Sequence, residues 1–156
     1  VHVLDRVDAE AVDAEVDPRL VDVTHPLDDL GALGEQVVQT REVAAGEAVG
    51  YSCAWIAEAP SVVATVSAGY ADGLPRSLSN NAVLWDGDTP CPLIGRVSMD
   101  LITVDVSHLA QIPRYLDIIG PNQSIDDLAD IAGTIGYEIL TNLSNRYNRR
   151  YYEGTA

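Results

Sequence analysis

The sequence contains neither lysine nor phenylalanine, and each absence limits what the chain can do. All nine strongly basic residues are arginine. A Schiff base between an enzyme and an aldehyde cofactor requires a lysine amine, so this chain cannot form one with its own side chains. Because phenylalanine is missing, the core must be built from aliphatic side chains with a few tyrosines and tryptophans.

Positive charge is also scarce. Nine arginines stand against 24 acidic residues, which gives a formal net charge of −15. Nucleic acids and anionic membrane surfaces attract basic proteins, so we expect neither as a partner. No apolar run approaches the ~18 residues that cross a bilayer, and the many acids in residues 1–17 are atypical of a secretory leader. We therefore expect a soluble protein located in the cytoplasm.

Cysteine and histidine are too few and too scattered to indicate a metal or redox site. Cys53 and Cys91 lack the spacing of a CxxC motif, so we expect two reduced thiols. His2, His25 and His108 lie far apart in the sequence. We expect no bound metal and find no arrangement of the Ser–His–Asp type.

The distribution of charge changes near residue 36. Residues 1–36 hold ten acids and two arginines, and Pro18 and Pro26 interrupt their one amphipathic stretch. We interpret residues 1–36 as an acidic lead segment or linker. The remaining residues, 37–156, have the length of a single domain.

Short β-branched runs separated by turn residues dominate the second part of the chain. The pattern predicts strands over residues 36–43, 48–56, 61–66, 82–85, 91–97, 101–106, 117–120 and 137–143. Asp86-Gly87 is typical of a hairpin turn. The pattern also predicts a helix that begins after Ser124, a capping residue, and ends at Gly133. Many short strands with one or two short helices predict a mainly β fold, a closed Greek-key-like β-barrel.

Four stretches of the chain together resemble the C-terminal domain of alanine racemases. They are Gly46–Tyr51, Gly69–Gly73 with Arg76, Gly95–Asp100, and Gly133–Thr141 running on to Arg146 and Arg149. Each stretch alone is weakly specific, but their shared order and spacing make the resemblance specific over residues 37–156. Members of this family have an N-terminal (β/α) barrel that carries the pyridoxal phosphate lysine, followed by a C-terminal β domain.

The resemblance implies that this chain is the β domain of a pyridoxal phosphate-dependent alanine racemase. Such an enzyme interconverts L-alanine and D-alanine and supplies cell-wall precursors. Two subunits form a homodimer in which each active site joins one subunit's barrel to its partner's β domain. The cofactor lysine would lie on a barrel that this sequence lacks, so we expect the chain alone to be inactive.

The resemblance also implies roles for individual residues. Tyr51 resembles the base that takes the α-proton from L-alanine and returns one in the reverse direction. Met99, through its backbone, and Tyr70 resemble residues that bind substrate, while Tyr137 resembles a tyrosine that hydrogen-bonds the cofactor phosphate. The residues that resemble the lining of a narrow entrance are Tyr70, Arg76, Arg96, Asp100 and Ile135.

Without the resemblance, these side chains have ordinary structural explanations. Tyr51 would be a cross-strand packing residue, Met99 a core residue, and Arg76 and Arg96 members of surface ion pairs. Two other functions also stay open. The chain could be a non-catalytic binding or assembly domain that kept the fold, or part of a racemase for serine or a broader set of amino acids.

Overall fold

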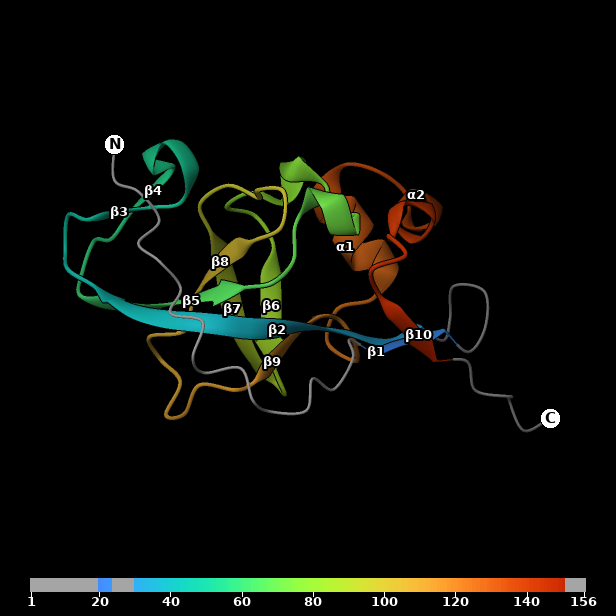
Figure 1. Cartoon of the computed structure of the whole chain (residues 1–156), viewed down its shortest axis with the longest axis horizontal. Coiled ribbons are helices and arrows are strands. Elements are labelled where there is room, and N and C mark those ends of the chain that lie inside the picture. The colour runs from blue at the N-terminus through green and yellow to red at the C-terminus, as the bar shows by residue number, and fades with distance from the viewer. Residues whose placement is uncertain (1–19, 24–29, 151–156) are drawn as a thin grey trace.

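The computed structural model describes residues 20–23 and 30–150, with side chains from 32 to 147. Figure 1 shows a barrel with two helices at one end and a small two-stranded extension at the other. The strands are β1 (Leu20–Val23), β2 (Leu30–Val43), β3 (Ala48–Val49), β4 (Trp55–Ile56), β5 (Ser61–Val66), β6 (Val83–Asp86), β7 (Thr89–Ile94), β8 (Ile102–Asp105), β9 (Tyr115–Ile119) and β10 (Asn148–Arg150). The helices are α1 (Ile125–Ala132) and α2 (Gly136–Asn142), with three 3₁₀ turns, η1 (Tyr51–Cys53), η2 (Tyr70–Asp72) and η3 (Arg76–Leu78).

Six strands form a closed antiparallel barrel, in the order β2, β5, β8, β7, β6 and β9. β2 closes the ring because its first half pairs with β9 and its second half, residues 37–43, pairs with β5. β1 lies between β2 and β10, and pairs with β10 in parallel. The predicted mainly β fold, a closed barrel with short helices, is confirmed.

The interior of the barrel is aliphatic, as the absence of phenylalanine requires. In β8, Ile102 and Val104 are buried while the residues between them are partly exposed, which is the alternation of a strand with one face in a core. Leu84 and Leu116 are fully buried from β6 and β9. Burial of each such side chain stabilises the fold by roughly 1.5–3 kcal/mol.

The predicted helix after Ser124 is confirmed as α1. The Ser124 hydroxyl accepts a hydrogen bond from the Asp127 N–H at 3.1 Å, and the Asp127 carboxylate accepts one from the Ser124 N–H at 2.8 Å. A hydrogen bond from the Ser124 hydroxyl to the Asp127 carboxylate at 2.7 Å, and then the bond from the Ser124 N–H, lower the pKa of Asp127. Gly133 ends the helix with a left-handed φ of 74°.

The predicted strand over residues 137–143 is wrong, because this segment forms helix α2. Ile139 and Leu143 are buried four positions apart, and Leu140 is partly buried between them. This is helical spacing, and it lets the segment pack beside α1 (Figure 1). The β-branched residues that favoured a strand were outweighed by this tertiary contact.

The predicted continuous strand over residues 48–56 is also wrong. β3 and β4 are two residues each, pair with one another, and are separated by the turn η1. Gly50 has a φ of 78°, and Ser52 and Cys53 also have positive φ values, so the chain reverses direction there. The turn raises Tyr51 out of the sheet.

The predicted boundary at residue 36 falls inside β2. Residues 1–19 and 24–29, most of the predicted lead segment, lie outside the described residues, and the division of the chain stays a prediction. Within residues 20–23 and 30–150, no helix combines the length and apolar character needed to cross a membrane.

Candidate functional site

The stretch Gly95–Asp100 contacts the segments that carry Tyr51, Tyr70 and Arg146. The backbone N–H of Tyr70 donates to the carbonyl of Ser98 at 3.0 Å, and that of Ala71 donates to the carbonyl of Met99 at 2.9 Å. A Cβ atom at Gly69 would overlap the Met99 carbonyl oxygen, so only glycine permits this contact. Tyr70 and Met99 are therefore held close together by their backbones.

Tyr51 is brought to the same region by a contact between two glycines. An ideal Cβ atom on Gly50 would lie 3.3 Å from the Cα atom of Gly95, which means that the two backbones pack directly together. Tyr51 follows at once on η1 and is 75% exposed. In Figure 1, η1 and the turns η2 and η3 lie along the same side of the barrel as α2.

The stretch that begins at Gly133 and runs on to Arg146 contacts two of the other stretches through polar side chains. Arg146 Nη1 lies 2.5 Å from Asp100 Oδ1 and 3.6 Å from Asp72 Oδ1. The hydrogen bond with Asp100 raises the pKa of Arg146, so the guanidinium keeps its charge. Asp72 is buried and accepts a hydrogen bond from the Gly69 N–H at 3.0 Å. Three of the four stretches are thus linked through one arginine.

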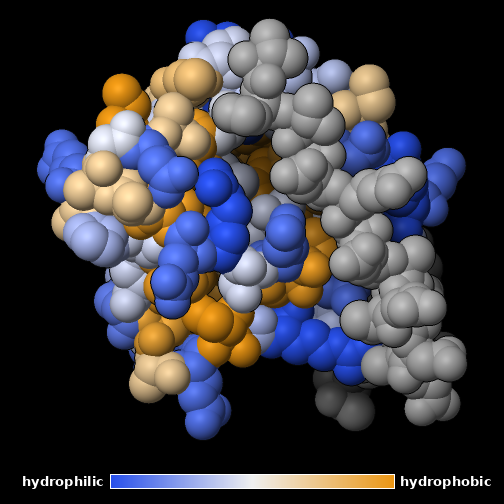
Figure 2. Space-filling model, turned by 60° about the vertical axis from the view of Figure 1, so that its left-hand side comes forward, coloured by the Kyte–Doolittle hydropathy of each residue, from blue (hydrophilic) through white to orange (hydrophobic). Residues whose placement is uncertain are grey.

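Several of the predicted site residues are large apolar side chains that remain exposed. Met99 is 52% exposed, which shows that the core explanation for this residue is wrong. The same group of exposed side chains contains Tyr51, Tyr70, Ile135 and Tyr137. Figure 2 shows that hydrophobic and hydrophilic side chains are interspersed on the face it presents.

The predicted entrance residues occupy different environments. Arg76 and Arg96 are exposed, and neither forms an ion pair within the part of the chain that the structure describes. Asp100 instead pairs with Arg146. Two exposed arginines with no ion-pair partner among the described residues are suited to attracting a carboxylate.

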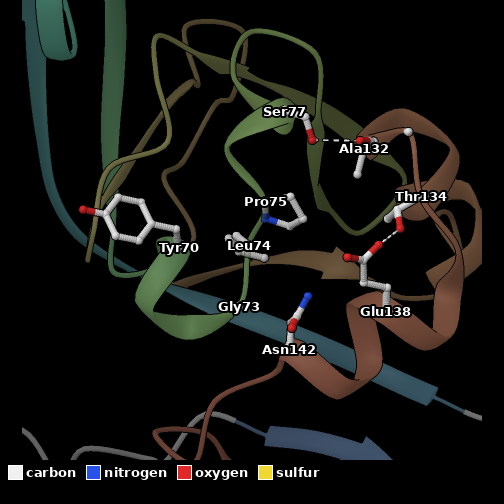
Figure 3. A pocket seen from close by; sticks show the side chains of 10 residues that line it. Tyr70, Gly73, Leu74, Pro75, Ser77, Ala132, Thr134, Glu138 and Asn142 are labelled. Atoms are coloured by element: carbon white, nitrogen blue, oxygen red, sulfur yellow. Dashed lines mark hydrogen bonds between the residues drawn. The ribbon is translucent and has the colours of Figure 1, made fainter.

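A pocket of about 430 Å³ lies beside Tyr70, between the turns η2 and η3 and the two helices (Figure 3). The Tyr70 ring points away from the other labelled side chains. The side chain of Glu138 accepts a hydrogen bond from Thr134, and Ser77 donates one to the Ala132 carbonyl at 2.8 Å. The lining contains one carboxylate and no basic residue, so it does not suit a phosphate group.

The two cysteines differ in position: Cys53 lies in η1 with Tyr51, and Cys91 lies on β7. Both thiols are free, as predicted, with Cys53 exposed and Cys91 buried. Burial, together with the nearby carboxylates of Asp86 and Asp105, raises the pKa of Cys91 to about 11. A thiol with this pKa stays protonated at neutral pH and is a poor nucleophile. In the described part of the chain, no three His, Cys, Asp or Glu side chains are placed to hold a metal ion.

Comparison with known proteins places the chain in a family. The family model described as "Alanine racemase, C-terminal domain" matches residues 31–151. The chain belongs to this family. It is 69% identical over 115 residues to an alanine racemase of Cereibacter sphaeroides, which covers 74% of this chain and 33% of that protein. It is also 46% identical over 133 residues to "Alanine racemase, catabolic" of Agrobacterium fabrum, covering 83% of this chain and 34% of that protein.

Solved structures of alanine racemases share the fold. The enzyme from Bartonella henselae, determined with covalently bound pyridoxal phosphate, aligns with a TM-score of 0.75 and 40% identity over 78% of this chain and 34% of that one. The biosynthetic enzyme from Pseudomonas aeruginosa aligns with a TM-score of 0.73 and 42% identity over 80% of this chain and 36% of that one. The chain thus spans about a third of the length of the relatives it matches.

Sequence reasoning missed one residue that hydrogen-bonds to both the Tyr51 turn and the Gly95–Asp100 stretch. Asn80 has a left-handed φ of 58° and bonds to two of the segments described above. Asparagine in a loop tolerates this conformation, which was the only signal in the sequence. The structural partners of Asn80 are distant in the chain, so the pattern of residues around it could not reveal its role.

Proposed function

We propose that this chain is the β-domain part of an alanine racemase and that Tyr51 is the base that removes the α-proton from L-alanine. The observation that carries the proposal is that backbone and ion-pair contacts join the four stretches, while Tyr51, Tyr70 and Met99 remain exposed. A domain that kept only its fold would have no reason to retain Tyr51, Met99 and Tyr137 together as exposed side chains.

The hydrogen bonding of these residues supports their availability to a substrate. Within residues 32–147, no partner takes up the hydroxyl groups of Tyr51, Tyr70 or Tyr137. The Met99 carbonyl is used by Ala71, while the Met99 N–H makes no hydrogen bond among the described residues. A fixed N–H is a suitable donor to the carboxylate of an amino acid.

The residues present do not by themselves fit pyridoxal phosphate. The sequence has no lysine, and the pocket beside Tyr70 has no basic lining residue. We propose that the cofactor lysine belongs to the barrel domain of another subunit, in a homodimer, and that Tyr137 reaches the phosphate across the interface. The cofactor would supply an electron sink that acidifies the α-proton.

Each candidate site residue of this chain then has one role. Tyr51 would accept or return a proton at its hydroxyl oxygen, and Met99 would orient the substrate carboxylate. Tyr70 would exclude large side chains, while Arg76 and Arg96 would attract the carboxylate at the entrance. We propose that the enzyme works in the cytoplasm and that its D-alanine supplies cell-wall precursors.

The experiment uses the assembled enzyme, either the full-length protein that carries this domain or this chain mixed with a lysine-bearing barrel. Tyr51→Phe should slow conversion of L-alanine to D-alanine at least ~10²-fold, the scale of one positioned acid or base. The control is Tyr115→Phe, which changes a tyrosine on β9 outside the candidate site.

The outcomes separate the proposal from its alternatives. Unchanged turnover in Tyr51→Phe would remove Tyr51 from the mechanism. Failure of the assembled wild-type protein to form any D-alanine would favour a binding or assembly domain. Faster turnover of serine than of alanine would keep the mechanism and change the substrate.

A further inference from the structure

Unusual backbone conformations are concentrated at one place in the molecule. Three non-glycine residues in the described part of the chain have positive φ: Ser52 at 61°, Cys53 at 52° and Asn80 at 58°. Ser52 and Cys53 immediately follow Tyr51. L-residues disfavour this conformation, and it persists only where surrounding structure enforces it.

Asn80 supplies such enforcement through its side chain and its backbone. Its Oδ1 atom accepts a hydrogen bond from the Gly95 N–H at 2.5 Å, and its Nδ2 atom donates to the Ala54 carbonyl at 3.3 Å. Its own N–H donates to the Gly95 carbonyl at 3.1 Å. One asparagine therefore connects the end of the Tyr51 turn to the start of the segment that carries Met99.

The neighbouring contacts leave little freedom for these two segments to shift. Gly50 and Gly95 pack backbone against backbone, so neither can approach closer. The hydroxyl of Ser79 accepts a hydrogen bond from the Val97 N–H at 3.0 Å, next to the Gly95 contact. Ser79 and Asn80 thus hydrogen-bond to the two residues that flank Arg96 in the sequence, Val97 and Gly95.

We infer that Asn80 is a positioning residue, which sets the place of the Tyr51 hydroxyl relative to the Met99 N–H. Asparagine is suited to this position for two reasons. It tolerates the left-handed conformation, and its amide offers both the acceptor for Gly95 and the donor for Ala54. The inference rests on the proposed function, because it gives Asn80 its importance through Tyr51.

Two variants of the assembled enzyme test the inference. Asn80→Asp keeps an acceptor for Gly95 and loses the donor to Ala54, whereas Asn80→Gly keeps the backbone conformation and loses both side-chain bonds. We expect each to lower kcat/KM by about 10- to 100-fold, the scale of a misplacement near 1 Å. Asn81→Ala is the matched control, because Asn81 bonds to Ser77 and does not touch the Tyr51 turn.

A primary deuterium isotope effect at the α-carbon distinguishes positioning from a general loss of folded enzyme. If Tyr51 is displaced, proton removal from L-alanine becomes more rate-limiting, so the isotope effect on kcat/KM should rise with α-deuterated L-alanine. It should not rise with α-deuterated D-alanine, whose α-proton would be removed from the opposite face by the lysine of the barrel domain rather than by Tyr51. A smaller fraction of folded enzyme would lower kcat and leave both isotope effects unchanged.

Each result decides the question. Wild-type kinetics in both variants, or lower activity with neither isotope effect altered, would overturn the inference. Failure of Asn80→Gly to fold, measured by circular dichroism, would also overturn it by making Asn80 a structural residue. Unchanged turnover in Tyr51→Phe would instead defeat the proposed function, whereas slow Tyr51→Phe with normal Asn80 variants would defeat this inference alone.

Discussion

The barrel and the exposed side that bears Tyr51 are built on different principles. In the barrel, regular antiparallel pairing and aliphatic burial act together over many residues, as in the register of β5 with β8. On the exposed side, positions depend on a few individual contacts. They include the Gly50–Gly95 packing, the Asn80 hydrogen bonds and the Arg146 ion pair.

This difference affects how each region responds to substitution. A distributed core loses stability with each deletion but keeps its geometry, because many neighbours share the change. A surface held by single contacts can lose its geometry at little cost in stability. We therefore expect the barrel to control the free energy of unfolding and the exposed side to control turnover.

The largest effect on stability should come from the barrel. Leu116→Ala removes a fully buried side chain from β9 and should lower the free energy of unfolding by about 2–5 kcal/mol. In the assembled enzyme, turnover per folded molecule should stay close to that of the wild type. Urea denaturation measures the first quantity and active-site titration the second. Val38→Ala, on the exposed surface of β2, is the control and should change stability by less than about 0.5 kcal/mol.

Gly69→Ala should break the contact between two of the site-bearing stretches. The new Cβ atom would overlap the backbone of Met99, so the two segments must separate at a cost of about 1–3 kcal/mol. In the assembled enzyme, we expect turnover to fall by more than the loss of folded protein accounts for. In the control Gly120→Ala, the Cβ atom would meet Asp117 Cβ at an ordinary 3.7 Å. Equal loss of activity in both variants would contradict the comparison.

Loss of the N-terminal cap of α1 should have a smaller effect on stability. It should alter neither the barrel nor the exposed side that bears Tyr51. Ser124→Ala removes the hydroxyl that accepts from the Asp127 N–H, and should cost about 1 kcal/mol. Ser124→Asp restores an acceptor and should recover most of the loss. Thermal unfolding followed by circular dichroism measures both. A large fall in turnover would show that α1 contributes to the geometry of the site.

The smallest effect should be a gain in stability. Burial, and then repulsion from Asp86, raise the pKa of Asp117 on β9. Because the folded protein holds this proton more tightly than the unfolded chain, ionisation at higher pH disfavours folding. Asp117→Asn should therefore raise the melting temperature at pH 7 by about 1–3 °C. The gain should disappear as pH falls below the ordinary range for aspartate, and a gain that grows in acid would reverse the sign of this argument.

The sequence predicted most of the barrel and one of the two helices. α1 was predictable because its signals are local: Ser124 caps it and Gly133 ends it. α2 was not, because its β-branched residues favour a strand until packing beside α1 is known. The turn at Tyr51 was hidden for a similar reason, since Asn80 reaches the carbonyl of Ala54 across 26 positions of sequence.

The candidate site was predictable only in part. Family resemblance supplied Tyr51, Met99 and Tyr137, because their order and spacing persist in the sequence. Residue chemistry alone favoured packing roles for the first two of these residues. The contribution of Asn80 depends on hydrogen bonds that form only after the chain has folded, and no local pattern indicates them.

The pairing of β1 with β10 determines when folding can finish. Leu20 pairs with Asn148, and the hydroxyl of Tyr147 donates to the buried carboxylate of Glu35 at 2.6 Å across 112 positions. Contacts between such distant positions slow folding, because a long loop must close before they form. During synthesis, β1 leaves the ribosome long before β10, its parallel partner, exists. The edge of β1 that later pairs with β10 therefore stays unpaired until synthesis is nearly complete. Unpaired strand edges promote aggregation, so the domain is most prone to aggregate during this period.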